Sequence, residues 1–254
     1  MRRGLDPWVV FHRPNPLASV RLFCLPYAGG SASIFRSWPA ALSSEVELGA
    51  IQLPGRERRL GEPPISHLPT LVEAVAGSLQ GYADMPFAIY GHSMGAMVGF
   101  EVARHLRREG KEGPVCLFLS GFRAPQRTNL HPLIYDLPED EFLEGLRRLE
   151  GTPEEVLQNR ELLQIMMPAL RADFTIVNTY IYTHEPPLDC PISIFGSLED
   201  SEVSREDFEA WREQTTREFK LRMMPGGHFF LHTAYPAILQ ALGADLSAIL
   251  KFGR

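Results

Sequence analysis

The chain has few cysteines and no hydrophobic run that could cross a membrane. Its 254 residues include three cysteines, Cys24, Cys116 and Cys190, each within or at the start of an apolar stretch. This pattern predicts buried reduced thiols, and neither a disulfide framework nor a zinc site. No apolar run approaches the roughly 20 residues of a transmembrane helix, and the N-terminal segment lacks the apolar region of a signal peptide. We therefore expect a cytoplasmic protein that binds neither a membrane nor a metal.

Net positive charge and phosphate-binding motifs are also lacking. The formal net charge is −6, which argues against a nucleic-acid-binding protein, because such proteins normally present a basic face. Neither G-x-G-x-x-G nor G-x-x-x-x-G-K-[ST] occurs in the chain, so the sequence does not predict a phosphate-binding loop. With 44% hydrophobic and 22% charged residues, the composition is otherwise that of an ordinary globular protein.

Short apolar runs alternate with helical patterns along most of the chain. Continuous runs of this length are typical of strands that are buried on both faces, whereas residues 68–81 and 95–109 carry helical spacing. The alternation predicts an α/β fold with a mostly parallel central sheet and helices on both faces. The predicted strands are residues 20–26, 46–54, 86–91, 115–121, 191–197 and 219–225.

The alternation stops between about residues 123 and 185. Helical stretches follow one another there without a strand between them, and Pro138 and Pro153 stand where the first turn of a helix tolerates proline. These residues either add helical packing or form a lid over a site. We favour a lid, because an insertion after a central strand overhangs the ends of the strands. The chain is thus expected to be one domain, 1–254, with a helical lid at about 123–185.

The strongest local signal is the sequence Gly-His-Ser-Met-Gly at residues 91–95. It lies between a predicted strand and a predicted helix, which is the context of a nucleophile elbow. The turn in such an elbow is so sharp that Gly91 and Gly95 are needed where a Cβ would clash. The turn projects the serine hydroxyl above the sheet, so the pattern predicts that Ser93 is a nucleophile.

A nucleophilic serine needs a general base, and the base needs an acid that orients it. In this fold the acid and then the histidine follow the serine, in loops after late strands. His228 follows the last predicted strand in the sequence PGGH, and it is favoured over His232, four residues later. The acid belongs after the preceding strand, where Glu199 and Asp200 are neighbours, and spacing alone does not choose between them.

A glycine-containing turn follows the first predicted strand, in the sequence LPYAGGS at residues 25–31. A tight turn at this position leaves backbone N–H groups free to bind an oxyanion. We expect one such group from Ala28 and the other from Met94, the residue after the nucleophile.

Several longer segments together are more specific than the elbow alone, namely LFCLPYAGGSAS, IQLPGRERR, PFAIYGHSMGAMVGFEVAR, and DFEAWREQT followed by FKLRMMPGGHFFL. Through these segments the chain resembles the discrete type II thioesterases that accompany polyketide synthases and nonribosomal peptide synthetases. The resemblance implies the α/β-hydrolase fold with a helical lid, Ser93 as nucleophile, His228 as base, and oxyanion donors at Ala28 and Met94. It also favours Asp200 as the acid, three residues before a valine, although this chain has GSLEDS where the family commonly has Gly-x-Asp-Asp-Pro.

The resemblance implies a hydrolase that removes stalled or misprimed acyl groups from acyl or peptidyl carrier proteins. The phosphopantetheine arm belongs to the substrate, so no cofactor is implied. The nearest alternative is a medium-chain fatty acyl-carrier-protein thioesterase, followed by a general carboxylesterase. A non-catalytic docking partner of a synthase is a further alternative, which intact Ser93, Asp200 and His228 disfavour. Because the first predicted strand begins by about residue 20, we expect a free-standing enzyme, and we expect it to be a monomer.

Two groups of residues are candidates for contact with the substrate or a partner. If the insertion is a lid, methionines that adapt to different shapes are suited to line it, although ordinary helix packing is the alternative for each. The candidate lining residues are Met166, Met167 and Phe174. An arginine run after the second predicted strand is interpreted either as a contact for a carrier protein or as a solvated loop. Its members are Arg56, Arg58 and Arg59.

Overall fold

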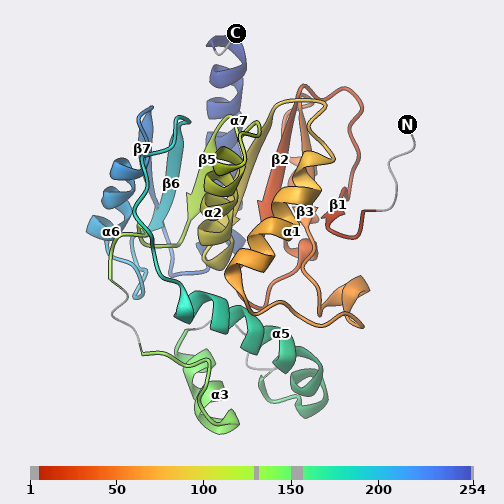
Figure 1. Cartoon of the computed structure of the whole chain (residues 1–254), viewed down its shortest axis with the longest axis vertical. Helices are drawn as coiled ribbons and strands as arrows, with labels where there is room; N and C mark the ends of the chain where they lie inside the picture. The colour runs from red at the N-terminus through yellow and green to blue at the C-terminus, as the bar shows by residue number, and fades with distance from the viewer. Residues whose placement is uncertain (1–5, 129–131, 150–156, 253–254) are drawn as a thin grey trace.

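A computed structural model describes residues 6–128, 132–149 and 157–252 of the chain (Figure 1). Within these ranges a seven-stranded sheet has the order β1-β3-β2-β4-β5-β6-β7. The strands are β1 (Val9–Val10), β2 (Val20–Leu25), β3 (Val46–Ile51), β4 (Phe87–His92), β5 (Leu117–Ser120), β6 (Ile192–Ser197) and β7 (Phe219–Met224). All neighbours pair in parallel except β1 with β3, which confirms the predicted α/β fold.

Helices cover both faces of the sheet, with α1 and α2 in front and α7 behind it in Figure 1. The main helices are α1 (Leu68–Gln80), α2 (Met94–Arg108), α3 (Glu139–Arg148), α5 (Arg160–Thr179), α6 (Arg205–Glu209) and α7 (Tyr235–Phe252). The 3-10 turns are η1 (Ala32–Phe35), η2 (Trp38–Ala40), η3 (Glu57–Arg59), η4 (Ala210–Gln214) and η5 (Phe230–His232). The helices predicted at 68–81 and 95–109 therefore agree with α1 and α2 to within one residue at each end.

Alternate residues of the central strands enter two separate hydrophobic layers. In β2, Leu22 and Cys24 pack on the side of α7, whereas Phe23 and Leu25 pack on the side of α1 and α2. All six residues of β2 are buried, as expected of a strand covered on both faces. Burial of each large apolar side chain contributes about 1.5–3 kcal/mol. The continuous apolar runs of the sequence are thus a direct consequence of the two-layer packing.

The sequence analysis missed β1. This strand has only two residues, and it pairs Val9 with Ile51 and Val10 with Ala50 at the edge of the sheet. Two residues are too few to show the alternation by which a strand is predicted. The antiparallel pairing depends on contact with β3, some 40 residues later in the chain.

In the inserted segment, residues 123–185, the helices α3 and α5 lie below the sheet in Figure 1, beyond the end where the parallel strands finish. Its α5 begins after Asn159, whose side chain accepts the Leu162 N–H at 3.1 Å, a standard helix cap. Pro138 precedes the first turn of α3 as predicted, and Pro153 lies outside the described residues. The helices α3 and α5 pack around a small hydrophobic cluster of their own that includes Phe142.

The helical pattern of the inserted segment extends too far at its C-terminal end. The pattern runs to residue 184, whereas α5 ends at Thr179 and the residues up to 185 are non-helical. Tertiary contacts explain the difference. The hydroxyl of Tyr180 donates to Glu101 at 2.7 Å, and the Arg104 guanidinium of α2 bonds the carbonyl of Thr183. These contacts hold the chain extended where its local pattern favours helix.

The three cysteines are free. Cys24 and Cys116 are buried as predicted, and burial raises the pKa of both thiols, whereas Cys190 is half-buried and burial raises the pKa of its thiol to about 12. None of these groups is therefore a thiolate at neutral pH. Among the described residues, no helix combines the length and apolar character that a bilayer crossing requires. The same residues contain no group of three or more His, Cys, Asp or Glu side chains placed to hold a metal.

Candidate active site

The turn between β4 and α2 has no space for side chains at its two glycines. A Cβ on Gly91 would lie 2.1 Å from the carbonyl oxygen of Gly95, and one on Gly95 would lie 2.3 Å from that of Leu25. Ser93 itself has a φ of 52°, a left-handed conformation that costs a non-glycine residue about 1–3 kcal/mol. Its N–H donates to the Ser120 carbonyl of β5 at 2.7 Å. The strained turn therefore presents the Ser93 side chain at the end of the sheet.

Three polar side chains form a continuous hydrogen-bonded chain at this turn. His228 Nε2 lies 3.1 Å from Ser93 Oγ, and His228 Nδ1 lies 3.0 Å from Asp200 Oδ2. The Asp200 side chain is fully buried, and its Oδ1 accepts the backbone N–H groups of Glu202 at 2.8 Å and Val203 at 3.2 Å. With Nδ1 protonated toward the carboxylate, Nε2 is the acceptor for the serine hydroxyl. The arrangement can therefore remove a proton from Ser93.

Of the two neighbouring acids, Asp200 is the one whose carboxylate contacts His228. Glu199 is exposed, and its backbone N–H bonds the carbonyl of Gly226 at 3.3 Å and the hydroxyl of Ser197 at 3.2 Å. The bond to Gly226 fastens the loop after β6 to the loop after β7. The pairing of the two loops brings the Asp200 carboxylate to the imidazole.

The rival histidines have other partners. His92 is fully buried, with Nδ1 2.9 Å from Ser120 Oγ. Its burial lowers the pKa well below the ordinary value of 6.5, so the ring is neutral at pH 7. His232 Nε2 lies 3.0 Å from the Tyr27 hydroxyl, and burial lowers the pKa of this ring as well. Of the histidines in the described ranges, it is His228 that hydrogen-bonds Ser93.

The turn after β2 has the geometry expected of an oxyanion-binding turn. The Gly30 N–H donates to the Tyr27 carbonyl at 2.9 Å, and Gly29 has a φ of 79°, as the third residue of a type II turn requires. We refer to Tyr27–Gly30 as the oxyanion turn. Ala28 lies inside this turn, between Tyr27, whose carbonyl accepts the hydrogen bond, and Gly30, whose N–H donates it. Met94 is the first residue of α2, and an N–H in the first turn of a helix has no acceptor within the helix.

A cavity of about 290 Å³ opens at the Ser93–His228 pair. Its wall is mainly apolar, and the inserted segment supplies a large part of it. A cavity of this kind can hold a hydrocarbon chain with its reactive end at the serine. The apolar lining residues from the inserted segment are Pro132, Ile134, Leu146, Leu149, Phe174 and Val177.

Of the three predicted lining residues, one lines this cavity. All three pack against the hydrophobic cluster of the inserted segment, and Phe174 in addition lies in the wall of the cavity. All three residues lie on α5. Phe174 lies about two turns further along α5, nearer its C-terminal end.

The arginine run does not form the surface that the sequence suggested. Arg56 is buried and bonds Asp173 of α5 through both terminal nitrogens, at 2.6 and 2.9 Å. Arg59 is also buried, and its guanidinium pairs with Glu62 at 2.6 Å. Both interpretations, the carrier-protein contact and the solvated loop, are thus wrong for these two arginines, and Arg58 alone of the run is exposed. Sequence analysis missed Asp173, because no local pattern marks its distant partner.

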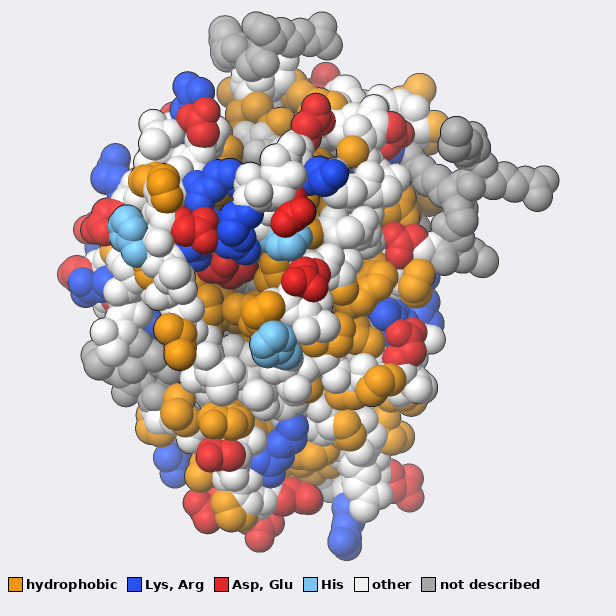
Figure 2. All heavy atoms as spheres, viewed as in Figure 1, with side chains coloured by type: hydrophobic (Ala, Val, Ile, Leu, Met, Phe, Trp, Pro, Cys, Tyr) orange, Lys and Arg blue, Asp and Glu red, His pale blue; other side chains and the backbone are white. Residues whose placement is uncertain are grey.

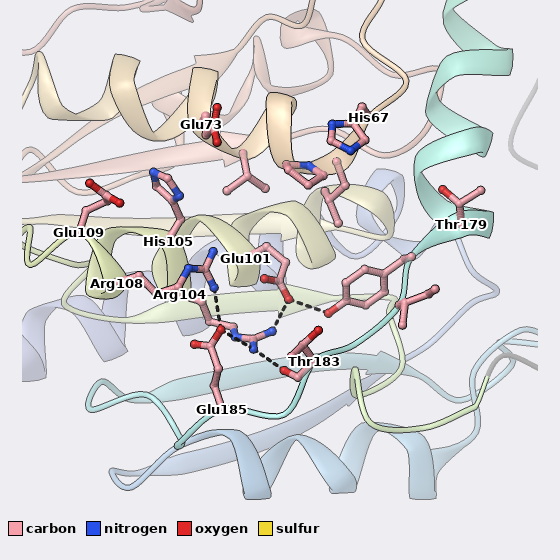
Figure 3. Close-up of a pocket in the computed structure, with 15 residues that line it drawn as sticks. His67, Glu73, Glu101, Arg104, His105, Arg108, Glu109, Thr179, Thr183 and Glu185 are labelled. Carbon is pink, nitrogen blue, oxygen red and sulfur yellow. Dashed lines mark hydrogen bonds and ion pairs between the residues drawn. The ribbon is translucent and has the colours of Figure 1, made fainter.

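A second cavity, of about 650 Å³, lies between α1, α2 and the chain that follows α5 (Figure 3). Its lining shares no residue with the cavity at Ser93. Glu101 accepts hydrogen bonds from Arg104 at 2.6 Å and Tyr180 at 2.7 Å, and Glu185 pairs with Arg104 at 2.9 Å and with Arg108 at 2.7 Å. Figure 2 shows acidic and basic side chains intermingled on this face. The opposite charges of the cluster neutralise one another. Its hydrogen bonds and ion pairs fasten the end of the inserted segment to α2.

Comparison with known proteins gives consistent matches along the chain. The family model described as "Thioesterase domain" matches residues 20–246. The chain is 44% identical to the gramicidin S biosynthesis protein GrsT of Aneurinibacillus migulanus, over 97% of this chain and 96% of the relative. It is 38% identical to thioesterase PikA5 of Streptomyces venezuelae, over 94% and 85% of the two chains. Among solved structures, the type II thioesterase BorB from the borrelidin biosynthetic cluster superposes with a TM-score of 0.86 at 35% identity, covering 95% of this chain and 98% of BorB.

Proposed function

The chain belongs to the thioesterase family, and from this premise we propose that it hydrolyses acyl thioesters on the phosphopantetheine arm of acyl or peptidyl carrier proteins. Its relatives include a gramicidin S biosynthesis protein and thioesterase PikA5, and its structural neighbours include type II thioesterases, one of them from an NRPS/PKS biosynthetic pathway. The observation that carries the proposal is the hydrogen-bonded chain Ser93–His228–Asp200 at the end of an apolar cavity. The role proposed is editing, the removal of stalled or misprimed acyl groups.

The first half-reaction transfers the acyl group to the enzyme. As Ser93 Oγ attacks the thioester carbonyl carbon, its proton passes to His228 Nε2, and the carbonyl electron pair moves to oxygen. The Ala28 and Met94 N–H groups donate to that oxyanion. Collapse of the intermediate breaks the C–S bond, and the imidazolium returns the proton to the departing pantetheine sulfur. The product is an ester of Ser93.

The second half-reaction releases the acid. Water takes the place of the thiol, gives its proton to His228, and attacks the ester carbonyl through a second oxyanion at the same N–H groups. Breakage of the C–O bond returns the proton from His228 to Ser93 Oγ. In both steps the buried Asp200 carboxylate holds the imidazole in the required tautomer and stabilises its charged form.

Assays with defined thioesters test the proposal. Purified protein is given carrier proteins loaded with short and medium acyl chains, the same acyl groups on free pantetheine, and matched simple esters. We expect carrier-bound short acyl groups to have the highest kcat/KM. Ser93→Ala is expected to lower turnover by about 10⁴-fold or more without loss of the fold, because Ser93 contributes little packing.

The other outcomes separate the alternatives. A preference for medium chains on carrier proteins indicates fatty acyl release, and equal rates for esters and thioesters indicate a general carboxylesterase. Binding of carrier proteins without turnover indicates a docking partner. Full activity in well-folded Ser93→Ala protein would contradict the mechanism.

We further propose that the enzyme acts in the cytoplasm as a monomer and uses no cofactor of its own. Free thiols at all three cysteines suit a reducing compartment. The mechanism above takes every proton transfer through residues of the chain. Light scattering coupled to size-exclusion chromatography measures the oligomeric state, and a stable dimer at assay concentration would contradict the monomer.

A further inference from the structure

We propose that Asp173, on α5 of the inserted segment, is a positioning residue that holds the oxyanion turn in its reactive geometry. The inference rests on the proposed function, because the group that it positions is the Ala28 N–H. Asp173 does not contact the reacting atoms. It acts through the backbone of Gly29 and, together with Arg56, through that of Gly30.

The contacts of Asp173 reach both glycines of the turn. Its Oδ2 accepts the backbone N–H of Gly29 at 2.7 Å. The same oxygen accepts a hydrogen bond from one terminal nitrogen of Arg56 at 2.6 Å, and Oδ1 accepts a hydrogen bond from the other at 2.9 Å. The Arg56 nitrogen on Oδ2 also donates to the carbonyl of Gly30 at 3.1 Å. The carboxylate and the guanidinium therefore bind the turn directly after Ala28.

The need for such a clamp follows from the sequence of the turn. Two consecutive glycines restrict the backbone less than any other pair of residues, so the turn is poorly fixed by its own conformational preferences. Peptide units are planar, and only the φ and ψ of Ala28 lie between its own N–H and that of Gly29. Fixing the Gly29 N–H on a buried carboxylate consequently restricts the direction of the Ala28 N–H.

The energetics favour positioning over simple packing. Asp173 is 1% exposed and Arg56 is 8% exposed. A buried ion pair loses most of its attraction to desolvation, and apolar residues of similar size would stabilise a fold as well. The charged pair instead fixes an orientation. The bidentate contact with the guanidinium orients the carboxylate, whose Oδ2 remains a strong acceptor for the Gly29 N–H. Because this N–H belongs to the oxyanion turn, its orientation affects catalysis.

The chain offers a matched control for the experiment. α5 is followed at once by Tyr180, whose hydroxyl donates to Glu101 beside Arg104 of α2 (Figure 3). This contact also fastens the inserted segment to the core, yet it lies in the other cavity and touches no part of the oxyanion turn. Tyr180→Phe therefore removes an anchor of the same segment and leaves the turn intact.

The test compares Asp173→Ala, Asp173→Asn and Tyr180→Phe on a free acyl pantetheine thioester. A second readout is inhibition by an alkyl trifluoromethyl ketone, which forms a hemiketal oxyanion with Ser93. We expect Asp173→Ala to lower kcat by about 10- to 100-fold, a part of the 10²–10³ that an oxyanion donor supplies, with KM changed less than about threefold. Inhibitor affinity should fall by a factor similar to that of kcat.

The remaining variants set the limits of the inference. Asp173→Asn keeps a neutral acceptor for Gly29 and should lose less kcat than Asp173→Ala. Tyr180→Phe should lower the melting temperature and leave kcat and inhibitor affinity unchanged. If Asp173→Ala does not fold, Asp173→Asn and Arg56→Lys carry the test.

Folded Asp173 variants with wild-type kcat and inhibitor affinity overturn the inference, as does a Tyr180→Phe variant that loses both equally. An active Ser93→Ala variant overturns the proposed function instead.

Discussion

At the scale of single residues, the site depends on which of two neighbouring acids reaches the imidazole. Asp200 contacts His228 and is buried, while Glu199 is exposed. Two backbone N–H groups donate to Asp200 Oδ1, which leaves Oδ2 for the imidazole. The orientation of the carboxylate is therefore set before substrate binds.

Asp200→Asn and Glu199→Gln are expected to differ strongly in activity. Asparagine cannot stabilise the imidazolium and favours the wrong tautomer, so kcat should fall by about 10⁴-fold. The second substitution changes an exposed side chain and should leave kcat within about twofold, which steady-state assays measure directly. A larger loss at Glu199 than at Asp200 would place the acid one residue earlier.

His92 makes the stability of the fold depend on pH. Burial, and next the charges of His228 and His232, lower the pKa of His92 well below 6.5. Below pH 6.5 the unfolded chain binds a proton at this position that the folded chain does not, so stability is full above that pH and falls as the pH falls. The contribution approaches 1.4 kcal/mol per pH unit. Urea unfolding at pH 5.5 and 7.5 should show a smaller pH difference for His92→Gln than for the wild type. Equal differences would contradict the assignment.

At the scale of elements, α5 performs two tasks along one helix. One part of it packs inside the inserted segment, where Met166 and Met167 lie, and another part faces the cavity at Ser93 through Phe174. Asp173 is adjacent to Phe174 but points to Arg56 and Gly29. The helix thus joins the cavity at Ser93 to the oxyanion turn.

Phe174→Ala is expected to alter chain-length preference. Removal of the ring enlarges the apolar cavity, so the ratio of kcat/KM for longer over shorter acyl groups should rise about threefold or more, measured on paired thioesters. This magnitude corresponds to the roughly 0.8 kcal/mol that one buried methylene contributes.

Met166→Ala and Met167→Ala are the matched controls. Neither residue lines the cavity, so they should lower thermal stability and leave the ratio unchanged. A shift of the ratio in the methionine variants, without one in Phe174→Ala, would mean that acyl chains occupy a different part of the segment.

At the scale of the whole molecule, the inserted segment has its own hydrophobic cluster, separate from the two layers of the sheet. Phe142 is fully buried in this cluster, and Phe23 is fully buried in β2. A cavity-forming substitution in the sheet layers should therefore destabilise the whole fold, whereas one in the cluster of the inserted segment should destabilise that segment alone.

Phe23→Ala should destabilise the whole fold by about 3–5 kcal/mol, seen as a shift of the urea midpoint. Phe142→Ala should act locally, because segments with their own small core open independently. Hydrogen exchange should then show loss of protection in α3 and α5 with the sheet still protected. Equal loss of protection in both regions would show that the segment and the sheet unfold as one unit.

The sequence by itself determined the features that depend on short stretches of chain. The elbow at Ser93 follows from steric limits within five residues, and the sheet strands follow from continuous apolar runs. The placement of His228 follows from the order of elements in the fold. For the elbow and the strands the cause and the pattern lie in the same segment, and the position of His228 follows from their order along the chain, so all three could be predicted without coordinates. Asp200 was favoured over Glu199 by the family resemblance, although local spacing did not choose between them.

Tertiary structure alone decided the features that join distant segments. The contact of Arg56 with Asp173 spans 117 positions, and it converted a charged run that was expected at the surface into a buried clamp. The short edge strand β1 and the presence of Phe174, but not of the two methionines, in the cavity wall have the same origin. Each depends on which side chains meet after folding, and the free energy of those contacts leaves no local pattern in the sequence.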